Sequence, residues 1–356
     1  MSRVLQLSLL LFAFPVAAAI EVDGVQIEVV DAHLHTLESP GDFNLEGKAA
    51  IVSKLPNFVV PYYAALAAQI GDPYAPILGI ADQLDWAGVD RGVVLATYTQ
   101  HTVGFATNRH VEELIWDERN IDESGRPRFL GLASINLDDF EDEAIRSVRL
   151  DALQTYLFDD RFIGIKLAHA HQGVAFDDPT LDELYGLAAE AGVPMLLHTG
   201  ISPFPGTKVE AEYTNPSALE NAIERFNGLG EDGRVEFVLS HVGTADATAT
   251  AAALELAAAH DNVWLELSAL GQDMVYDLNG NESTVTGPQH PWIVKDILDL
   301  GLVERTIFAS DGPQRSGKVR TYLEDIVSSM MASGFTTAQM ERVLSGSFYD
   351  CFGVAD

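Results

Sequence analysis

Residues 162–200 read FIGIKLAHAHQGVAFDDPTLDELYGLAAEAGVPMLLHTG and predict a strand, a helix and a second strand. Apolar runs of strand length lie at 162–167 and 194–198, and a helical pattern lies between them at 178–191. Pro179 stands near the start of this helix, and Gly192 stands just past its end, where a left-handed residue commonly terminates a helix. This alternation is typical of a parallel sheet.

The same alternation extends over most of the chain. Strands are predicted at 25–31, 91–96, 129–135, 162–167, 194–198, 235–240, 263–267 and 306–309. Helical stretches are predicted between them, for example at 140–158, 178–191, 217–227, 245–260 and 292–300. Eight strand–helix units predict a single (β/α)8 TIM barrel of α/β class over residues 20–356. An open doubly wound sheet is the alternative, but no glycine-rich phosphate loop follows the first strand.

The segment 37–83 is longer than a simple connection between a strand and a helix. It contains five prolines and an aromatic pair, Tyr62 and Tyr63. Two compatible interpretations stay open: an insertion that packs on the barrel rim, or a lid that recognises substrate.

Residues 1–19 have the outline of a signal peptide. Arg3 precedes an apolar run at 4–14, and small residues follow at 16–19. The apolar run is shorter than the about 20 residues that a bilayer requires. We therefore expect cleavage near Ala19 and export to the periplasm or beyond, without stable membrane insertion afterwards.

The amino-acid composition limits the kinds of molecule that the protein is expected to bind. Hydrophobic residues make up 47% of the 356 residues and charged residues 21%, as in globular proteins. A single cysteine, Cys351, excludes an internal disulfide framework and a cysteine-based zinc site. The net charge of −32 disfavours nucleic acid, whose phosphates would be repelled. A small-molecule substrate is therefore expected.

Histidines gather at the predicted carboxyl ends of strands, where a barrel builds its active site. In DAHLHT (31–36), His33 and His35 are two residues apart, so an extended strand projects both from one face. Alone, this pair is a weak indication. Four later strands end near further polar side chains: Lys166, His198, His241 and Asp311. The barrel would bring all six to one mouth.

Two or three imidazoles with one carboxylate make a site for zinc or a similar divalent ion. Such an ion lowers the pKa of bound water and polarises a carbonyl oxygen. Asp311 could hold the metal and accept the proton of the attacking water, and His241 suits general acid or base catalysis. Structural alternatives are core histidines at His198 and His241, a helix cap at Asp311 and an ion pair or substrate contact at Lys166. The nearby His169 and His171 fit supporting or loop positions better than ligand positions.

The order HxH, Lys, His, His, Asp resembles the amidohydrolase superfamily, and residues 162–200 closely resemble its amidohydrolase-related branch. The similarity covers about 29–352, although Ser347 stands where the family usually has Asn. It implies metal binding by His33, His35, His198 and Asp311 and a catalytic or second-metal role for His241. A carbamylated lysine at Lys166 would bridge two ions. Members that resemble aminocarboxymuconate-semialdehyde decarboxylase use one ion and no such lysine.

These features favour hydrolysis of an amide, lactone or other ester through metal-activated water. The alternative is non-oxidative decarboxylation of an aromatic or unsaturated acid, with His241 protonating the carbon. An exported binding protein without catalysis is disfavoured, since every ligand type is present. Tyr62, Tyr63, Tyr98, Arg109 and Phe204 are candidate pocket residues by position only.

Overall fold

The computed structural model describes residues 20–22, 24–36, 38, 73–74, 79–122, 124–202, 204, 206–271, 287–313 and 317–355. The predicted signal peptide, 1–19, lies outside the described residues, as does most of the segment 37–83 with Tyr62 and Tyr63. Within the described ranges, no helix combines the length and the apolar character needed to cross a bilayer.

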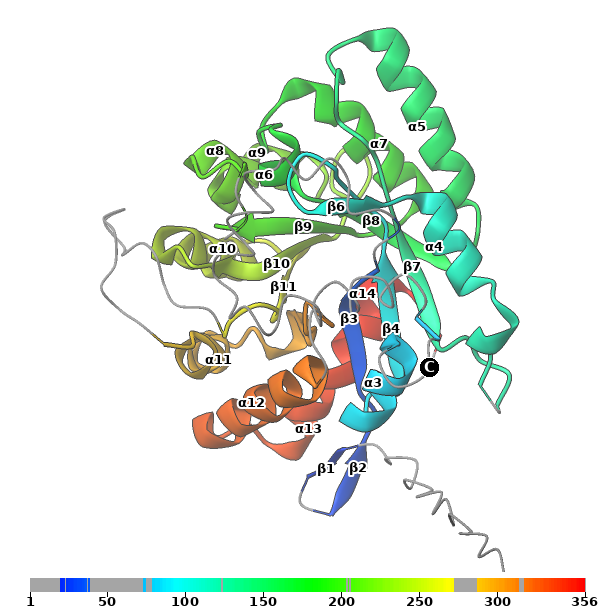
Figure 1. Cartoon of the computed structure of the whole chain (residues 1–356). Helices are drawn as coiled ribbons and strands as arrows, with labels where there is room; N and C mark the ends of the chain where they lie inside the picture. The colour runs from blue at the N-terminus through cyan, green and yellow to red at the C-terminus, as the bar shows by residue number, and fades with distance from the viewer. Residues whose placement is uncertain are drawn as a thin grey trace, which may run out of the picture.

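Eight parallel strands form the centre of the molecule, and the predicted TIM barrel is confirmed (Figure 1). In spatial order they are β3 (Val30–His35), β4 (Arg91–Leu95), β7 (Phe129–Ser134), β8 (Phe162–Leu167), β9 (Met195–Gly200), β10 (Phe237–Thr244), β11 (Val263–Glu266) and β12 (Thr306–Ile307). The two edges meet where Ala32 N donates to Phe308 O at 3.2 Å and His35 N donates to Gly312 O at 2.8 Å. These bonds close the barrel at β3 and the segment after β12.

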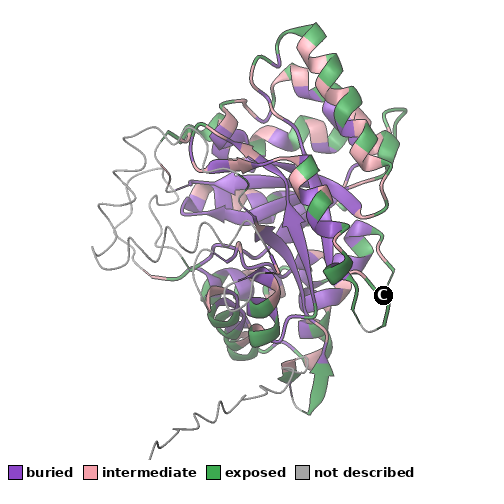
Figure 2. Ribbon diagram, turned by 45° about the vertical axis from the view of Figure 1, so that its right-hand side comes forward, coloured by how far each residue is buried: buried purple, intermediate pink, exposed green. Residues whose placement is uncertain are grey.

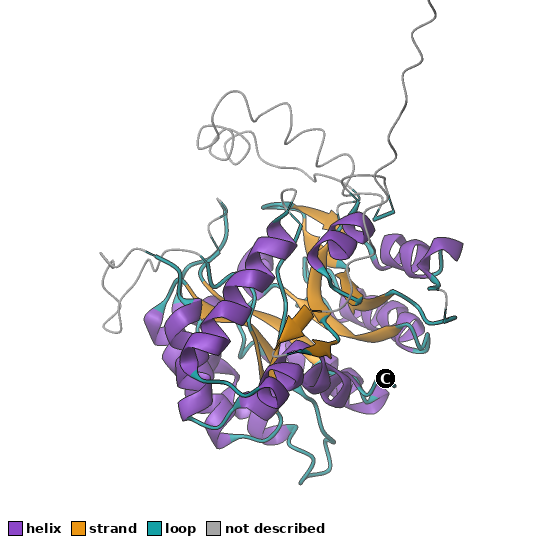
Figure 3. Cartoon of the chain, turned by 90° about the horizontal axis from the view of Figure 1, so that it is seen from below, coloured by secondary structure: helices purple, strands orange, loops and turns teal. Residues whose placement is uncertain are grey.

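Helices surround the strands (Figure 3). The α-helices are α3 (Ile80–Ala87), α4 (Asn108–Ile115), α5 (Glu143–Leu157), α6 (His169–Gln172), α7 (Asp182–Ala191), α8 (Ala211–Thr214), α9 (Glu220–Arg225), α10 (Ala247–Ala259), α11 (His290–Asp299), α12 (Lys318–Ser333), α13 (Thr337–Glu341) and α14 (Ser347–Phe352). Short 3-10 turns lie at Glu118–Asn120, Pro179–Leu181, Pro216–Leu219 and Val303–Arg305, and a π-helix at Arg342–Gly346 precedes α14. Gly192, with φ 67°, ends α7 as predicted.

The core has two layers, and Figure 2 shows the strands of the barrel buried along almost their whole length. Side chains on the outer face of the strands pack against the surrounding helices. Side chains inside the barrel, such as Leu132, Leu196 and Val238, form a second cluster with Phe348 and Phe352 of α14. Because α14 packs on this inner cluster, the barrel is a filled core and not a pore.

Two parts of the sequence prediction differ from the structure. The predicted strand 25–31 is split, since β2 (Val25–Ile27) pairs antiparallel with β1 (Ile20–Val22) around Gly24, and the barrel strand starts at Val30. Gly24 adopts φ 82°, which favours glycine, and so permits this tight hairpin. The predicted loop 37–83 overlaps α3, which begins at Ile80.

No bounds were predicted from the sequence for several other elements. They include the hairpin of β5 (Thr97–Thr99) with β6 (Gly104–Ala106), the helices α3 and α4, and the C-terminal helices α12 to α14. The strands of the hairpin are too short to produce a clear alternating pattern in the sequence.

Candidate metal centre

His33, His35 and Asp311 meet where the barrel closes. The Nε2 atoms of His33 and His35 lie 3.1 Å apart. Asp311 Oδ1 lies 3.1 Å from His35 Nε2 and 3.5 Å from His33 Nε2. Both histidines come from β3 and Asp311 follows β12, so the closure of the barrel assembles this group.

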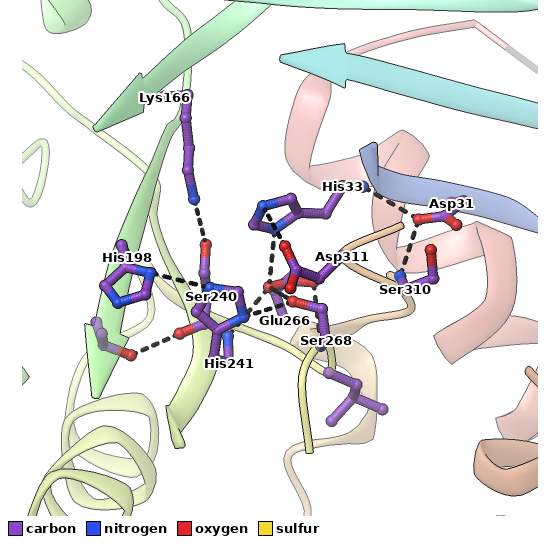
Figure 4. Close-up of polar contacts among 12 residues, drawn as sticks. Asp31, His33, Lys166, His198, Ser240, His241, Glu266, Ser268, Ser310 and Asp311 are labelled. Atoms are coloured by element: carbon purple, nitrogen blue, oxygen red, sulfur yellow. Dashed lines mark hydrogen bonds and ion pairs between the residues drawn. The ribbon is translucent and has the colours of Figure 1, made fainter. Parts of the chain in front are cut away.

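His241 and His198 lie beside this group (Figure 4). His241 Nε2 is 3.1 Å from His198 Nδ1, and the rings of His33 and His241 have centroids 5.1 Å apart. His33, His241 and Asp311 each offer a ligand atom, and these three atoms all lie within 4.8 Å of one another. His241 is therefore positioned either to bind a metal or to transfer a proton. His198 is connected to this group through its contact with His241.

Lys166 enters the cluster from β8, on the side of His198 (Figure 4). Its Nζ atom donates to Ser240 Oγ at 3.2 Å. Burial lowers the pKa of Lys166 to about 8, an effect that the charges of Glu266 and Asp311 oppose. In the part of the chain that the structure describes, no carboxylate oxygen lies within ion-pair distance of this amine.

Glu266, at the end of β11, was missed by the sequence analysis. Its Oε2 atom accepts from His241 N at 3.1 Å and from Ser268 Oγ at 2.9 Å, and lies 3.5 Å from His33 Nδ1. Burial raises the pKa of Glu266 to about 8, and the charge of Lys166 opposes the increase. The sequence contained one indication, because Glu266 ends an otherwise apolar strand, VWLE.

The protonation states suit a divalent cation. Burial lowers the pKa of His241 to about 3 and holds the pKa values of His33 and His198 well below their ordinary value. Burial would raise the pKa of Asp311, but the Lys318 ammonium and the bond with His35 hold it well below its usual range. Neutral imidazoles and an ionised carboxylate are ligands that zinc prefers.

Two observations test whether an ion fits this cluster. The nitrogen and oxygen atoms of His33, His35 and Asp311 converge within 3.5 Å, where acceptor atoms repel one another unless a proton or a cation lies between them. His198 Nε2 is buried and makes no hydrogen bond to any described residue. The donor set therefore fits a divalent ion held by His33, His35 and Asp311, with His241 or His198 completing it.

The backbone at two of these residues is strained. His241 has φ 67° and Asp311 has φ 55°, in the left-handed region that costs a residue other than glycine about 1–3 kcal/mol. Gly243 and Gly200 allow the chain after His241 to pack closely, because a Cβ atom on Gly243 would lie 2.3 Å from the carbonyl carbon of Ala249. Packing around β10 therefore holds His241 in this conformation.

The other candidate residues from the sequence analysis lie at different distances from the cluster. His171 Nδ1 is 2.6 Å from Thr102 Oγ1, and its ring centroid lies 5.3 Å from His198 and 6.2 Å from Phe204. These contacts place His171 and Phe204 at the border of the cluster. His169 packs instead against Phe176, with ring centroids 4.4 Å apart.

Arg109 does not reach the cluster. Its side chain is exposed and pairs with Glu113 on the same helix at 3.0 Å. The structure gives it no contact with any of the candidate ligands.

A parallel barrel with histidines and an aspartate at one mouth defines the class of TIM-barrel enzymes that act with a metal ion. The chain belongs to the amidohydrolase family, because the sequence model described as Amidohydrolase matches residues 30–346. A search of curated protein sequences finds no match.

Solved structures share the fold at low sequence identity. An uncharacterised TIM-barrel protein from Bordetella bronchiseptica is 17% identical, with 92% of this chain and 99% of that chain covered and a TM-score of 0.61. A dihydroxybenzoic acid decarboxylase from Polaromonas, with bound manganese and the inhibitor 2-nitroresorcinol, is 13% identical, with 92% and 97% covered and a TM-score of 0.55. A probable 2-pyrone-4,6-dicarboxylic acid hydrolase from Acinetobacter baumannii, with citric acid bound, is 15% identical, with 92% and 100% covered and a TM-score of 0.51.

Proposed function

We propose that this protein is a hydrolase that cleaves an amide, lactone or other ester bond of a small molecule through metal-activated water. The observation that carries the proposal is the two-sided arrangement of the cluster. His33, His35 and Asp311 form one side, and His198, His241 and the buried amine of Lys166, which donates to Ser240, form the other. This donor set is large enough for one or two ions, for which we propose zinc.

A divalent ion bound there would activate water and polarise the scissile carbonyl group. Asp311 is ionised and reaches the centre of the cluster, so its carboxylate can accept the proton of the attacking water. Neutral His241 can bind or relay a proton at Nε2 towards the leaving group.

Whether Lys166 is carbamylated determines whether the site would hold one ion or two. Its buried amine has a lowered pKa, so a larger share is neutral and able to react with carbon dioxide. The amine nitrogen would bond to the carbon of carbon dioxide and release one proton, which leaves a carbamate whose oxygens can bridge two ions. The 3.2 Å contact with Ser240 places the amine beside His198 and His241, where a second ion would lie.

A second candidate is decarboxylation of an aromatic or unsaturated acid. It is supported by the structural similarity to the dihydroxybenzoic acid decarboxylase, whose structure contains manganese. In this reaction Lys166 would stay an amine, one ion would orient the substrate carboxylate, and His241 would protonate the carbon that loses carbon dioxide.

A single comparison separates the two reactions. Purified protein would be analysed for bound metal, treated with a chelator, reloaded with zinc or manganese, and assayed against lactones, esters, amides and aromatic acids. Hydrolysis products that disappear with chelator and return with metal support the hydrolase. Carbon dioxide release without hydrolysis favours the decarboxylase, and full activity with chelator present contradicts both.

We also propose export, from the predicted signal peptide at 1–19. Intact-mass analysis of protein from the periplasm or medium should show a chain that begins near residue 20. A full-length chain confined to the cytoplasm would contradict this proposal.

A further inference from the structure

We propose that His171 is a substrate-binding residue of this protein, held in place by Thr102, and that its free ring nitrogen recognises a hydroxyl group on a small ester or lactone. The inference rests on the proposed function and names a substrate class for it. The scissile carbonyl group would lie at the metal centre, and the hydroxyl group would be a second polar feature that the site selects.

His171 lies at the border of the metal centre and stays accessible. It belongs to α6, the short helix directly after β8, and its ring lies edge-on to His198 with centroids 5.3 Å apart. The residue keeps 8% of its surface exposed. His169 of the same helix is fully buried and packs against Phe176 instead. Of these two histidines, only His171 can therefore reach a molecule bound at the cluster.

Only one nitrogen of the His171 ring is occupied. Nδ1 lies 2.6 Å from Thr102 Oγ1, whereas Nε2 makes no hydrogen bond to any described residue. Both nitrogens of His169 are enclosed, but Nε2 of His171 is not. A ring that is anchored at one nitrogen and open at the other is oriented in advance to bind a polar group.

Thr102 is itself held by the hairpin of β5 and β6. Its backbone N–H donates to Thr99 O at 3.0 Å, and Thr99 Oγ1 donates to Gly104 O at 2.6 Å across the turn. Gln100 Nε2 joins the hairpin to the loop after β7, because it donates to Asp138 Oδ2 at 2.7 Å. These bonds fix the position of Thr102 before a substrate binds, which lowers the entropy cost of binding.

Phe204 supplies an apolar surface beside His171. It follows β9, and the two rings have centroids 6.2 Å apart at an angle of 51°. Phe204 is half-buried, so part of its surface is free to contact a ligand. Small-molecule sites commonly combine apolar walls with a few polar groups of fixed position. An ester or lactone with an apolar part against Phe204 and a hydroxyl group at His171 Nε2 fits this border.

A hydroxyl group suits His171 whichever ring nitrogen carries the proton. The single proton of Thr102 Oγ1 can point to Thr99 O, at 3.2 Å, or to His171 Nδ1. In the first case Nε2 of a neutral ring accepts a hydrogen bond, and in the second it donates one. A hydroxyl group can do both, whereas a carbonyl oxygen can only accept. Recognition of a hydroxyl group therefore does not depend on the protonation state of the ring.

The test compares lactones that differ only in a hydroxyl group: γ-butyrolactone and its α-hydroxy and β-hydroxy derivatives. The measured quantity is the ratio of kcat/KM for each hydroxy derivative to kcat/KM for γ-butyrolactone, with the zinc-loaded protein. His171→Asn can keep the contact with Thr102 but has no atom at the position of Nε2. For at least one derivative this variant should lower the ratio by about 3- to 10-fold, as loss of one hydrogen bond would.

Comparison of the two proteins cancels differences in the intrinsic reactivity of the lactones. His171→Gln, which returns a polar group near the position of Nε2, should recover part of the ratio. Equal ratios in the wild type and His171→Asn would overturn the inference.

Variants of Thr102 test whether it positions His171. Thr102→Val removes the hydroxyl group and should lower the same ratio, whereas Thr102→Ser keeps the hydroxyl group and should restore it. Thr306→Val is the matched control, because Thr306 Oγ1 donates to Leu302 O at 2.9 Å at the start of β12. A loss of stability alone would reduce kcat/KM for all lactones together. An unchanged ratio in Thr102→Val would refute the positioning role of Thr102.

A binding measurement separates this inference from the proposed function. If no lactone is hydrolysed, saturation-transfer NMR compares the binding of the same lactones to the wild type and to His171→Asn. Stronger binding of a hydroxy derivative, lost in His171→Asn, supports the role of His171 while the proposed function fails. Equal binding of the lactones to both proteins refutes the role of His171, whatever the reaction.

Discussion

The Nε2 atom of His35 lies 3.1 Å from Oδ1 of Asp311, at the seam where β3 meets the segment after β12. These two side chains join the first and the last strands of the barrel through their contact. A metal ion at this point would therefore bind the folded chain and not the unfolded one, so metal binding should also stabilise the fold.

Removal of either partner should release the metal. We expect His35→Ala and Asp311→Asn to lower metal affinity by more than the about 10- to 100-fold typical of outer contacts, because each removes a direct ligand. Equilibrium dialysis with elemental analysis measures the bound metal. His260→Ala, at the C-terminal end of α10, is the control. Wild-type metal content in Asp311→Asn would refute its role as a ligand.

Exchange of Lys166 should change the number of ions. If the amine is carbamylated, Lys166→Met should reduce the metal content from two ions to one and lower kcat by at least about 100-fold, because a catalytic ion contributes several kcal/mol. Elemental analysis and carbon NMR with labelled carbon dioxide report the two effects. Lys295→Met, on the surface of α11, is the control. One ion per chain in both proteins would favour the decarboxylase.

A methyl group on Gly243 should displace the segment that carries His241. Its Cβ atom would lie 2.3 Å from backbone of Ala249, and its φ of 69° disfavours alanine. Gly243→Ala should lower the free energy of unfolding by about 1–3 kcal/mol and reduce activity. Urea unfolding and assays of kcat measure these changes.

Gly186 provides the control for this substitution. A Cβ atom on Gly186, within α7, meets no atom within 4 Å, so Gly186→Ala should stabilise the protein by about 0.5–1 kcal/mol. Equal stability of the two alanine variants would contradict the packing argument.

Burial of His169 should make the protein sensitive to acid. Burial, with the charge of Lys166, lowers the pKa of His169 from 6.5 to about 3, and neither ring nitrogen has a hydrogen-bond partner among the described residues. Between these pH values the unfolded chain binds a proton that the folded chain does not, so stability is lost as the pH falls through this window. His169→Leu should reduce that loss.

Urea unfolding at a series of pH values measures the effect. The difference between His169→Leu and the wild type at neutral pH reports packing alone and serves as the internal reference. A difference that stays constant from neutral pH down to pH 3 would show that His169 does not contribute to acid sensitivity.

Much of the fold could be predicted because it follows local periodicity. The runs at 91–96, 129–135 and 162–167 agree closely with β4, β7 and β8. Regions without a strong pattern were missed, such as the hairpin of β5 and β6. Glu266 was missed because a single acid within a strand does not reveal what its carboxylate will contact.

The candidate site shows the same division. Spacing gave a weak indication of His33 and His35, which the residues at later strand ends strengthened: Lys166, His198, His241 and Asp311. Alternation along a strand, however, does not allow consecutive residues to reach one cluster. Ser240 and His241 both do so, because the register of β10 shifts after Ser240 and His241 takes a left-handed backbone.

The sequence by itself determined the barrel and the types of side chain at its mouth, since both depend on local patterns of apolar and polar residues. Only the tertiary structure decided which atoms meet. The closure of β3 against the segment after β12 brings His35 to Asp311, and the bulge in β10 turns His241 inward. The physical reason is that these contacts join residues far apart in the chain, so their geometry depends on the register and packing of the whole barrel.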